Sequence, residues 1–363
     1  MIKIIDLHCD TVGQLQAGHD LAGSVPAGHV TLDRLQRGGV GTQVFACFVS
    51  SEVPQIDAFR RAVEMIENIH TYCEDTSQHF RLIDKPSEID RHETDQKINI
   101  LIAVENGYAL GNNLKNLERL KEKKVCYITL THSKHLSWAA SSGESHAPGN
   151  GLNKFGKKVI NAMNELGIIV DISHVHESTF WDVMKTTKRP VIASHSNARA
   201  VCNTVRNLSN DQIKAIARNG GMIGINFFPG FLDPTYALGL KTHCSDLFAE
   251  LDRIEKTYME DPAGKSRALQ MFAQELQKRM QEYAVYPDRI IDHICHIAGL
   301  VGTGHIGFGS DFDGVPALPT GIYGSDIYPA LLDGMRVRNF SNEDIEKIAA
   351  GNFIRVMKEN YSD

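Results

Sequence analysis

Ligand-type side chains recur in this chain directly after short apolar runs. Such runs precede His8 and Asp10, Glu105, His174, His195 and Asp311. In a parallel barrel, the residues at the carboxyl ends of the strands gather at one face, where active sites are built. Imidazole and carboxylate groups are also the side chains that hold two divalent cations in metal-dependent hydrolases. The pattern therefore predicts a two-metal hydrolase with its site at the mouth of a barrel.

Each of these residues also has a structural explanation when it is taken alone. His8 could be a core histidine that is hydrogen-bonded to a backbone carbonyl. Glu105 could pair with a distant arginine, since an unpaired buried carboxylate is costly. Asp311 could be a metal ligand, a proton carrier or both. His174 and His195 each follow a serine at the end of an apolar run, and two histidines in equivalent places on neighbouring strands favour the metal site.

Eight apolar runs predict the strands that position these residues. Most are continuous Val-, Ile- and Leu-rich stretches, as expected for strands that are buried on both faces. The predicted strands lie at about residues 3–7, 42–49, 99–104, 126–130, 168–172, 191–193, 222–227 and 306–309. Helical periodicity recurs between and after them at residues 58–72, 113–122, 156–166, 177–186, 211–219 and 342–358.

This alternation predicts an α/β chain that forms a (β/α)8 TIM barrel of the metal-dependent hydrolase, or amidohydrolase-like, type. A doubly wound open sheet is the alternative. The barrel is favoured because ligands that follow the first, third, fifth, sixth and eighth strands converge only in a closed ring.

Two stretches depart from the simple alternation of strands and helices. Residues 133–153 are rich in Ser, Gly, His and Asn and are expected to arch over the barrel mouth. A segment at about residues 231–288 is expected to form an insertion, and its charge-rich run at residues 246–283 has helical spacing. Neither stretch has the composition of a linker, so residues 1–363 are predicted to form one barrel domain.

Composition argues against several other classes of protein. Hydrophobic residues make up 42% and charged residues 23% of the 363 residues, a balance typical of a globular chain with a large core. The net charge is −6 and no basic patch stands out, so nucleic acid is not expected as a partner. No apolar run approaches the ~18 residues that a membrane span needs.

The compartment is predicted from the cysteines and the first residues of the chain. Seven cysteines are scattered without a Cys-x-x-Cys pair, which suits a reducing compartment better than a disulfide framework. The first residues enter a strand at once and lack the pattern of a signal peptide. We therefore expect a cytoplasmic protein.

Several segments that contain these residues match one family pattern jointly. They include Asp6-Leu7-His8-Cys9-Asp10-Thr11, Leu130-Thr131-His132-Ser133, Asp171-Ile172-Ser173-His174, Ser194-His195-Ser196, Arg206-Asn207 and Gly309-Ser310-Asp311-Phe312-Asp313-Gly314. Nearly end to end, the chain resembles the membrane (renal) dipeptidase family, peptidase family M19. The resemblance is to a soluble, bacterial-type member, since no counterpart to the signal, lipid anchor and disulfides of the mammalian members is seen.

The resemblance implies a set of ligands for two zinc ions per chain. His8 and Asp10 would bind one zinc ion, and His174 and His195 would bind the other. Glu105 would bridge the two ions. The implied enzyme is a dinuclear zinc metallopeptidase.

The resemblance also implies the residues that handle the substrate. His132 would face the scissile carbonyl as a catalytic and substrate-binding residue, Arg206 would hold the terminal carboxylate, and Asp311 would carry protons. From the residues alone, Arg206 reads as a surface arginine in a polar loop. The implied substrates are dipeptides with a free C-terminal carboxylate, with a D-residue tolerated at that position.

Some features differ from the family pattern or leave alternatives open. The family has Glu-Gly after the third strand, where this chain has Glu105-Asn106-Gly107. The residues after His132 also differ, so the side-chain preference is not predicted. The rival functions are an N-acyl-amino-acid deacylase or lactonase on the same barrel, and a non-catalytic metal-binding barrel. A homodimer is compatible with the sequence.

Overall fold

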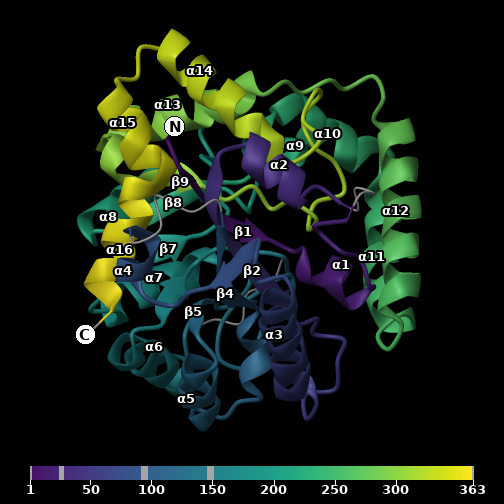
Figure 1. The fold of residues 1–363 in the computed structure, drawn as a ribbon, viewed down its shortest axis with the longest axis vertical. Coiled ribbons are helices and arrows are strands. Elements are labelled where there is room, and N and C mark those ends of the chain that lie inside the picture. The colour runs from purple at the N-terminus through teal and green to yellow at the C-terminus, as the bar shows by residue number, and fades with distance from the viewer. Residues whose placement is uncertain (1, 24–27, 91–96, 145–150, 362–363) are drawn as a thin grey trace.

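Parallel strands form the centre of the computed structural model (Figure 1), and the described residues contain nine strands in one sheet. The structure describes residues 2–23, 28–90, 97–144 and 151–361. The strands are β1 (Ile4–Cys9), β2 (Val40–Phe48), β3 (Phe80–Leu82), β4 (Ile98–Glu105), β5 (Val125–Thr129), β6 (Ile169–Asp171), β7 (Ile192–Ala193), β8 (Met222–Ile225) and β9 (Ile306–Phe308). Eight of them run in the order β2-β1-β9-β8-β7-β6-β5-β4, and pairing of β2 with β4 closes the ring. The fold is a (β/α)8 TIM barrel, as the sequence predicted.

The ninth strand, β3, lies outside the ring and was not predicted. Its residues Phe80–Leu82 pair with the first part of β4, and β5 pairs with the second part. Three residues are too few to show periodicity. The other eight strands each coincide with a predicted run.

Helices surround the strands in Figure 1. Their bounds are α1 (Val12–Gln16), α2 (Leu32–Arg37), α3 (Ala58–Asp75), α4 (Pro86–Asp90), α5 (Lys115–Glu122), α6 (Lys154–Leu166), α7 (Glu177–Thr186), α8 (Asn210–Arg218), α9 (Pro229–Leu232), α10 (Pro234–His243), α11 (Ser245–Thr257), α12 (Pro262–Arg279), α13 (Asp288–Val301), α14 (Tyr328–Val337), α15 (Asn342–Glu346) and α16 (Asn352–Asn360). The predicted terminal helix is divided into α15 and α16 by a π-helical turn, Lys347–Gly351.

The barrel interior is filled from alternate strand positions, because successive strand residues face opposite sides. A buried cluster joins Leu7, Leu101 and Tyr127 to inward residues of the other strands and to Phe353 and Met357 of α16. Helix α16 therefore closes the end of the barrel opposite the mouth. A second buried cluster fills the space between strands and helices.

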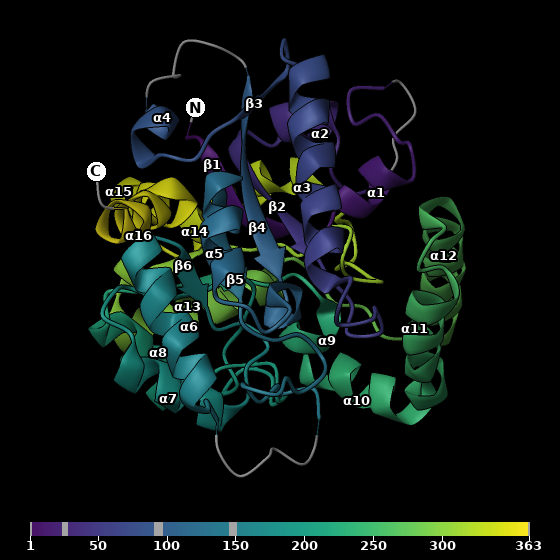
Figure 2. The same cartoon turned by 90° about the horizontal axis from the view of Figure 1, so that it is seen from below.

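The segment between β8 and α13 contains the helices α9 to α12. Helices α11 and α12 lie side by side at the edge of the molecule (Figure 2). Of the predicted arch over residues 133–153, residues 145–150 lie outside the described part. The described part of the arch is anchored to the mouth, where the Ser142 N–H donates to the His174 carbonyl at 2.8 Å. Among the described residues, no helix combines the length and apolar character of a membrane span.

Candidate metal centre

Strand alternation alone places Glu105 in the barrel mouth. Leu101 and Ala103 belong to the inner cluster, and Glu105 follows two residues later on the same face. Pairing with both neighbouring strands continues to this residue, opposite Phe48 and Thr129. Only 3% of Glu105 is exposed, so its carboxylate lies in a protein environment.

His8 reaches the same centre through an irregularity in β1. Leu7 belongs to the inner cluster, so regular alternation would turn His8 to the outer face. The pairing of β1 with β2 shifts register between Asp6 and Cys9. Such irregularities re-aim side chains, and His8 Nε2 lies 3.6 Å from the nearer Glu105 oxygen, Oε2.

Left-handed backbone conformations place two other residues at the ends of their strands. His174 has φ of 65° and Asp311 has φ of 64°, a region that side chains with a Cβ rarely adopt. Hydrogen bonds hold both residues there, and the Asp311 N–H donates to the His8 carbonyl at 3.1 Å. Backbone strain of this kind clusters at functional sites.

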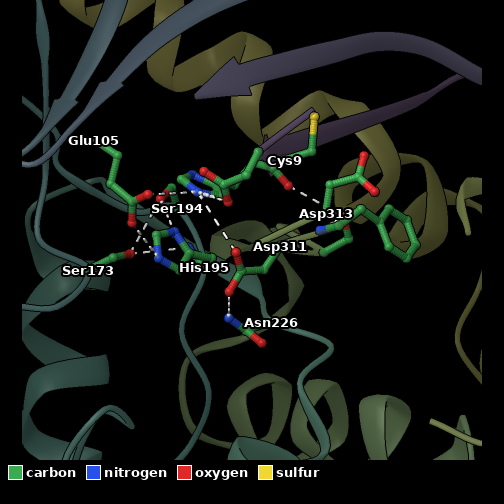
Figure 3. Close-up of polar contacts among 12 residues, drawn as sticks. Cys9, Glu105, Ser173, Ser194, His195, Asn226, Asp311 and Asp313 are labelled. Carbon is green, nitrogen blue, oxygen red and sulfur yellow. Dashed lines mark hydrogen bonds and ion pairs between the residues drawn. The ribbon is translucent and has the colours of Figure 1, made fainter. Parts of the chain in front are cut away.

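The two oxygens of Glu105 face different histidines. Oε2 lies 3.6 Å from His8 Nε2, while Oε1 lies 3.2 Å from His174 Nε2 and 3.5 Å from His195 Nε2. The two nitrogens of His174 and His195 are 2.8 Å apart. Figure 3 shows Glu105, His195 and Asp311 turned toward a common centre. The two carboxylate oxygens therefore have different nearest ring nitrogens.

Two more carboxylates lie on the His8 side. His8 Nε2 is 3.6 Å from Asp10 Oδ2 and 3.9 Å from Asp311 Oδ1. The other oxygen of Asp311, Oδ2, accepts a hydrogen bond from Asn226 Nδ2 at 2.7 Å (Figure 3). One side of the centre is therefore rich in carboxylates and the other side is rich in imidazoles.

These surroundings shift the pKa values in directions that suit cation binding. Burial would raise the pKa of Glu105, but His8 and His174 lower it well below its ordinary value. Burial, with nearby Arg206, holds the pKa of His174 well below its ordinary value. Burial does the same for His195. At neutral pH the centre therefore offers an ionised Glu105 carboxylate and neutral His174 and His195 rings, which are the forms that bind metal.

The donor set fits divalent cations. His8 Nε2 is buried and has no hydrogen-bond partner in the part of the chain that the structure describes. Ligand-type atoms form three groups, and within each group they all lie within 4.8 Å of one another. The groups are His8, Glu105 and His195; Glu105, His132 and His174; and His8, Asp10 and Asp311. An orphaned ring nitrogen among carboxylates is costly unless a cation joins them. Imidazole nitrogens with carboxylate oxygens are the ligands that zinc takes in catalytic sites.

His132 and Arg206 lie beside this centre. The ring of His132 is 4.4 Å from the rings of both Phe48 and His174. The guanidinium of Arg206 donates from Nη2 to the His195 carbonyl at 3.2 Å and lies over the Phe231 ring. The structure therefore brings all eight predicted site residues to one mouth.

Residues that support the centre received no role from the sequence. Tyr127 and Ser194 each contact a ring nitrogen of a site histidine, and Asp171 accepts from Ser194. A usable signal was the tyrosine inside an apolar strand, because a buried phenol needs a hydrogen-bond partner. Asn226, which donates to Asp311, could have been found from its position directly after β8.

Comparison with known proteins matches nearly the whole chain to one family. A family model described as membrane dipeptidase (peptidase family M19) matches residues 1–362. Human dipeptidase 3 is 27% identical over 336 residues, which cover 92% of this chain and 58% of dipeptidase 3. The chain thus spans little more than half the length of this curated relative.

Solved structures share the fold over nearly the whole chain. A metallopeptidase named dipeptidase AC has a TM-score of 0.80 at 23% identity, covering 100% of this chain and 99% of its own. A Rhodobacter sphaeroides metallopeptidase, liganded with a phosphinate mimic of the dipeptide L-Ala-D-Ala, has a TM-score of 0.79 at 21% identity, covering 99% of each chain. With the family model matched along its length, the chain belongs to the membrane dipeptidase family, peptidase family M19.

Proposed function

We propose that this protein is a dinuclear zinc dipeptidase that cleaves dipeptides with a free C-terminal carboxylate. The observation that carries the proposal is the position of Glu105, whose two oxygens face His8 on one side and His174 with His195 on the other. A carboxylate placed in this way suits a bridge between two cations. Membership of the family supports the same reaction.

The proposed ligands divide between the two sides of Glu105. His8 and Asp10 would hold one zinc ion, His174 and His195 would hold the second, and Glu105 would contact both. Bound zinc supplies Lewis-acid polarisation of the peptide carbonyl and lowers the pKa of bound water. The ligand atom of Asp311 also lies within 4.8 Å of those of His8 and Asp10, so Asp311 is close enough to share their cation. The metal content of an Asp311 variant would test whether it does.

Arg206 is the proposed recognition group for the substrate carboxylate. Its Nε is buried and lacks a hydrogen-bond partner among the described residues. A guanidinium binds a carboxylate through charge-assisted, paired hydrogen bonds. Because Arg206 lies beside His195, a carboxylate held there would be a short distance from the metal centre. This placement favours substrates as short as a dipeptide.

Asp311 and His132 are the proposed catalytic residues. Burial, with the carboxylates of Asp10 and Glu105, raises the pKa of Asp311 to about 7 in the metal-free site. A bound cation would favour the carboxylate and lower this pKa, so the group can take a proton from water and return it to the leaving amine. His132 lies beside His174 and would donate a hydrogen bond to the carbonyl oxygen as negative charge develops there.

Tolerance of a D-residue at the C-terminal position belongs to the same proposal. In it, Arg206 grips the carboxylate rather than the side chain of that residue. The Rhodobacter sphaeroides relative holds a mimic of L-Ala-D-Ala, which supports this substrate class for the present chain.

The direct experiment is hydrolysis of a panel of substrates by zinc-loaded protein, with the metal content measured on the same sample. We expect cleavage of L-Ala-L-Ala and L-Ala-D-Ala and little cleavage of their C-terminal amides. Cleavage of N-acetyl amino acids or lactones in place of dipeptides would favour the deacylase or lactonase alternative. Failure of the zinc-loaded protein to cleave any of these compounds would favour the non-catalytic alternative.

We further propose that residues 1–363 form one barrel domain with a helical insertion at about 231–288. The helices α9 to α12, which lie between β8 and α13, support this division.

A further inference from the structure

We propose that two buried hydroxyls, those of Tyr127 and Ser194, select the ring tautomers of His8 and His195 that can bind metal. In these tautomers Nδ1 carries the hydrogen, and the free lone pair of Nε2 faces Glu105. The inference rests on the proposed function, since the benefit of this tautomer is metal binding.

The hydrogen bonds of Tyr127 determine which nitrogen of His8 is protonated. The Tyr127 oxygen lies 2.7 Å from the Leu7 carbonyl and 2.8 Å from His8 Nδ1. A phenol has one hydrogen, and a carbonyl only accepts. When the Tyr127 O–H donates to Leu7, its oxygen is left to accept the N–H of His8 Nδ1. In the neutral ring, which is the form that binds metal, the lone pair then lies on Nε2.

The opposite tautomer of His8 would be poorly satisfied. It would direct an Nε2–H toward Asp10 and Glu105, whose nearest oxygens are each 3.6 Å away. These distances exceed normal hydrogen-bond lengths. It would also require the Tyr127 hydrogen to turn from the Leu7 carbonyl to Nδ1.

The tautomer of His195 is selected in the same way, by a second relay in which an acceptor orients a hydroxyl and the hydroxyl oxygen accepts from the ring. Ser194 Oγ lies 2.6 Å from Asp171 Oδ2 and 2.7 Å from His195 Nδ1. Both oxygens of Asp171 act as acceptors, because four donors surround them. The serine hydrogen therefore goes to Asp171, and the serine oxygen accepts from Nδ1–H. Figure 3 shows Ser194 beside His195.

Asp171 cannot readily turn away from this arrangement. Its Oδ1 accepts from the backbone N–H groups of Ser173 and Ser194 at 3.0 and 2.9 Å, and its Oδ2 accepts from Thr129 Oγ1 at 2.5 Å. The side chain is fully buried. Asp171 is therefore a fixed acceptor, and the hydroxyl it orients can present only its oxygen to His195.

The relays make Tyr127 and Ser194 positioning residues rather than metal ligands. Groups that hold the second nitrogen of a ligating histidine typically contribute 10- to 100-fold to metal affinity. They set both the ring orientation and the tautomer. In most metal sites a carboxylate, a backbone carbonyl or water has this role, whereas here it is a hydroxyl that is itself oriented by an acceptor.

The test is zinc affinity, measured by competition with a chelator, in Tyr127→Phe and Ser194→Ala. Each variant removes one hydroxyl and leaves the ligands in place. We expect one of the two zinc ions to bind ~10- to 100-fold more weakly in each variant. Thermal unfolding of the metal-free proteins confirms that the variants fold.

Matched controls remove similar hydroxyls away from the centre. Tyr72→Phe deletes a phenol that bonds Asp20 and the Leu21 N–H. Ser178→Ala deletes a serine hydroxyl 2.9 Å from the Nδ1 of His176, which is not a site histidine. Both controls should bind two zinc ions with wild-type affinity.

A second measurement reads the tautomer directly. In zinc-loaded protein with ¹⁵N-labelled histidine, NMR should show hydrogens on Nδ1 of His8 and His195 that exchange slowly with solvent. The Nδ1 hydrogen of the affected ring should exchange faster in Tyr127→Phe and in Ser194→Ala.

The outcomes separate this inference from the proposed function. A wild type that binds two ions, with hydroxyl-deleted variants that bind both equally well and keep the same exchange rates, would overturn the tautomer inference alone. A wild type that binds no zinc would overturn the proposed function and this inference with it.

Discussion

The carboxylate of Asp6 binds both the backbone N–H and the hydroxyl of Ser310, at 2.9 and 2.5 Å. The two residues lie 304 positions apart in the chain. Asp171 and Ser194 repeat the same pairing at 2.9 and 2.6 Å. In both cases a buried aspartate of one strand holds the serine that directly precedes a site residue, Asp311 or His195. The ends of neighbouring strands are thereby locked together at the mouth.

The Asp6 contact predicts a large loss of stability in Asp6→Ala. The substitution leaves the buried Ser310 N–H without its acceptor and leaves the Ser310 hydroxyl only the His8 carbonyl, at 3.3 Å. Each buried group that loses its partner costs about 1–3 kcal/mol, so for these two groups the free energy of unfolding of the metal-free protein should fall by about 2–6 kcal/mol. Denaturant unfolding measures this change. Asp33→Ala is the control, since its carboxylate is 74% exposed, and a control loss as large as that of Asp6→Ala would contradict the argument.

Glu105→Gln is predicted to disrupt the metal pair. The amide keeps the shape of the side chain but loses the charge and one acceptor oxygen. Metal analysis should therefore find at most one tightly bound zinc ion where the wild type binds two. Glu118→Gln, on the first turn of α5, should keep both. A Glu105→Gln protein that retained two ions with unchanged affinity would show that this carboxylate is not the bridge.

Arg206→Met is predicted to weaken the recognition of free dipeptides. A hydrogen bond to a charged group contributes about 1.5–3 kcal/mol, so kcat/KM for free dipeptides should fall by tenfold or more. The loss should be much smaller for C-terminal amides, which lack the carboxylate. Arg218→Met, on α8, should leave kcat/KM unchanged. Equal hydrolysis of amidated and free dipeptides by the wild type would contradict the assignment.

Asp311→Asn is predicted to keep most of its zinc while kcat falls. Asparagine is nearly isosteric but cannot accept and return a proton, and general acid–base catalysis typically contributes ~10²–10⁴-fold. The acid limb of the kcat/KM profile should shift or vanish, because the titrating carboxyl is gone. Loss of a zinc ion from the variant would show that Asp311 acts mainly as a metal ligand. Near-normal kcat would assign the proton to another group.

His293 predicts a pH dependence of stability that is independent of the metal centre. Burial lowers the pKa of His293 to about 4, and its ring bridges the Ala198 N–H and the Leu232 carbonyl. The ordinary value is 6.5, so between these two pH values the unfolded chain binds a proton that the folded chain excludes. Stability is therefore full above about pH 6.5 and falls as the pH drops toward about 4, by about 3 kcal/mol from this residue.

The measurement is denaturant unfolding of metal-free protein from pH 7 down to about pH 4. His293→Asn should be less stable than the wild type at pH 7 and should lose less stability on acidification. Parallel curves for the two proteins would contradict the depressed pKa. Metal-free samples are needed for both, because acid also releases bound cations.

The sequence by itself determined the barrel strands and predicted most of the residues that lie at the mouth. Strands that are buried on both faces are continuous apolar runs. Polar residues at the carboxyl ends of such runs therefore lie at the barrel mouth. Glu105 illustrates this best, since it follows Leu101 and Ala103 in strict alternation. The family pattern added His132 and Arg206, which spacing alone did not distinguish from ordinary polar residues.

Only the tertiary structure decided how the other side chains reach the centre. His8 depends on a register shift between β1 and β2, and His174 and Asp311 depend on left-handed backbones. The strand β3, the Tyr127 contact with His8 and the Asp6 contact with Ser310 all depend on chain segments far apart in sequence. Local periodicity carries no information on such contacts, because closure of the barrel is what brings their partners together.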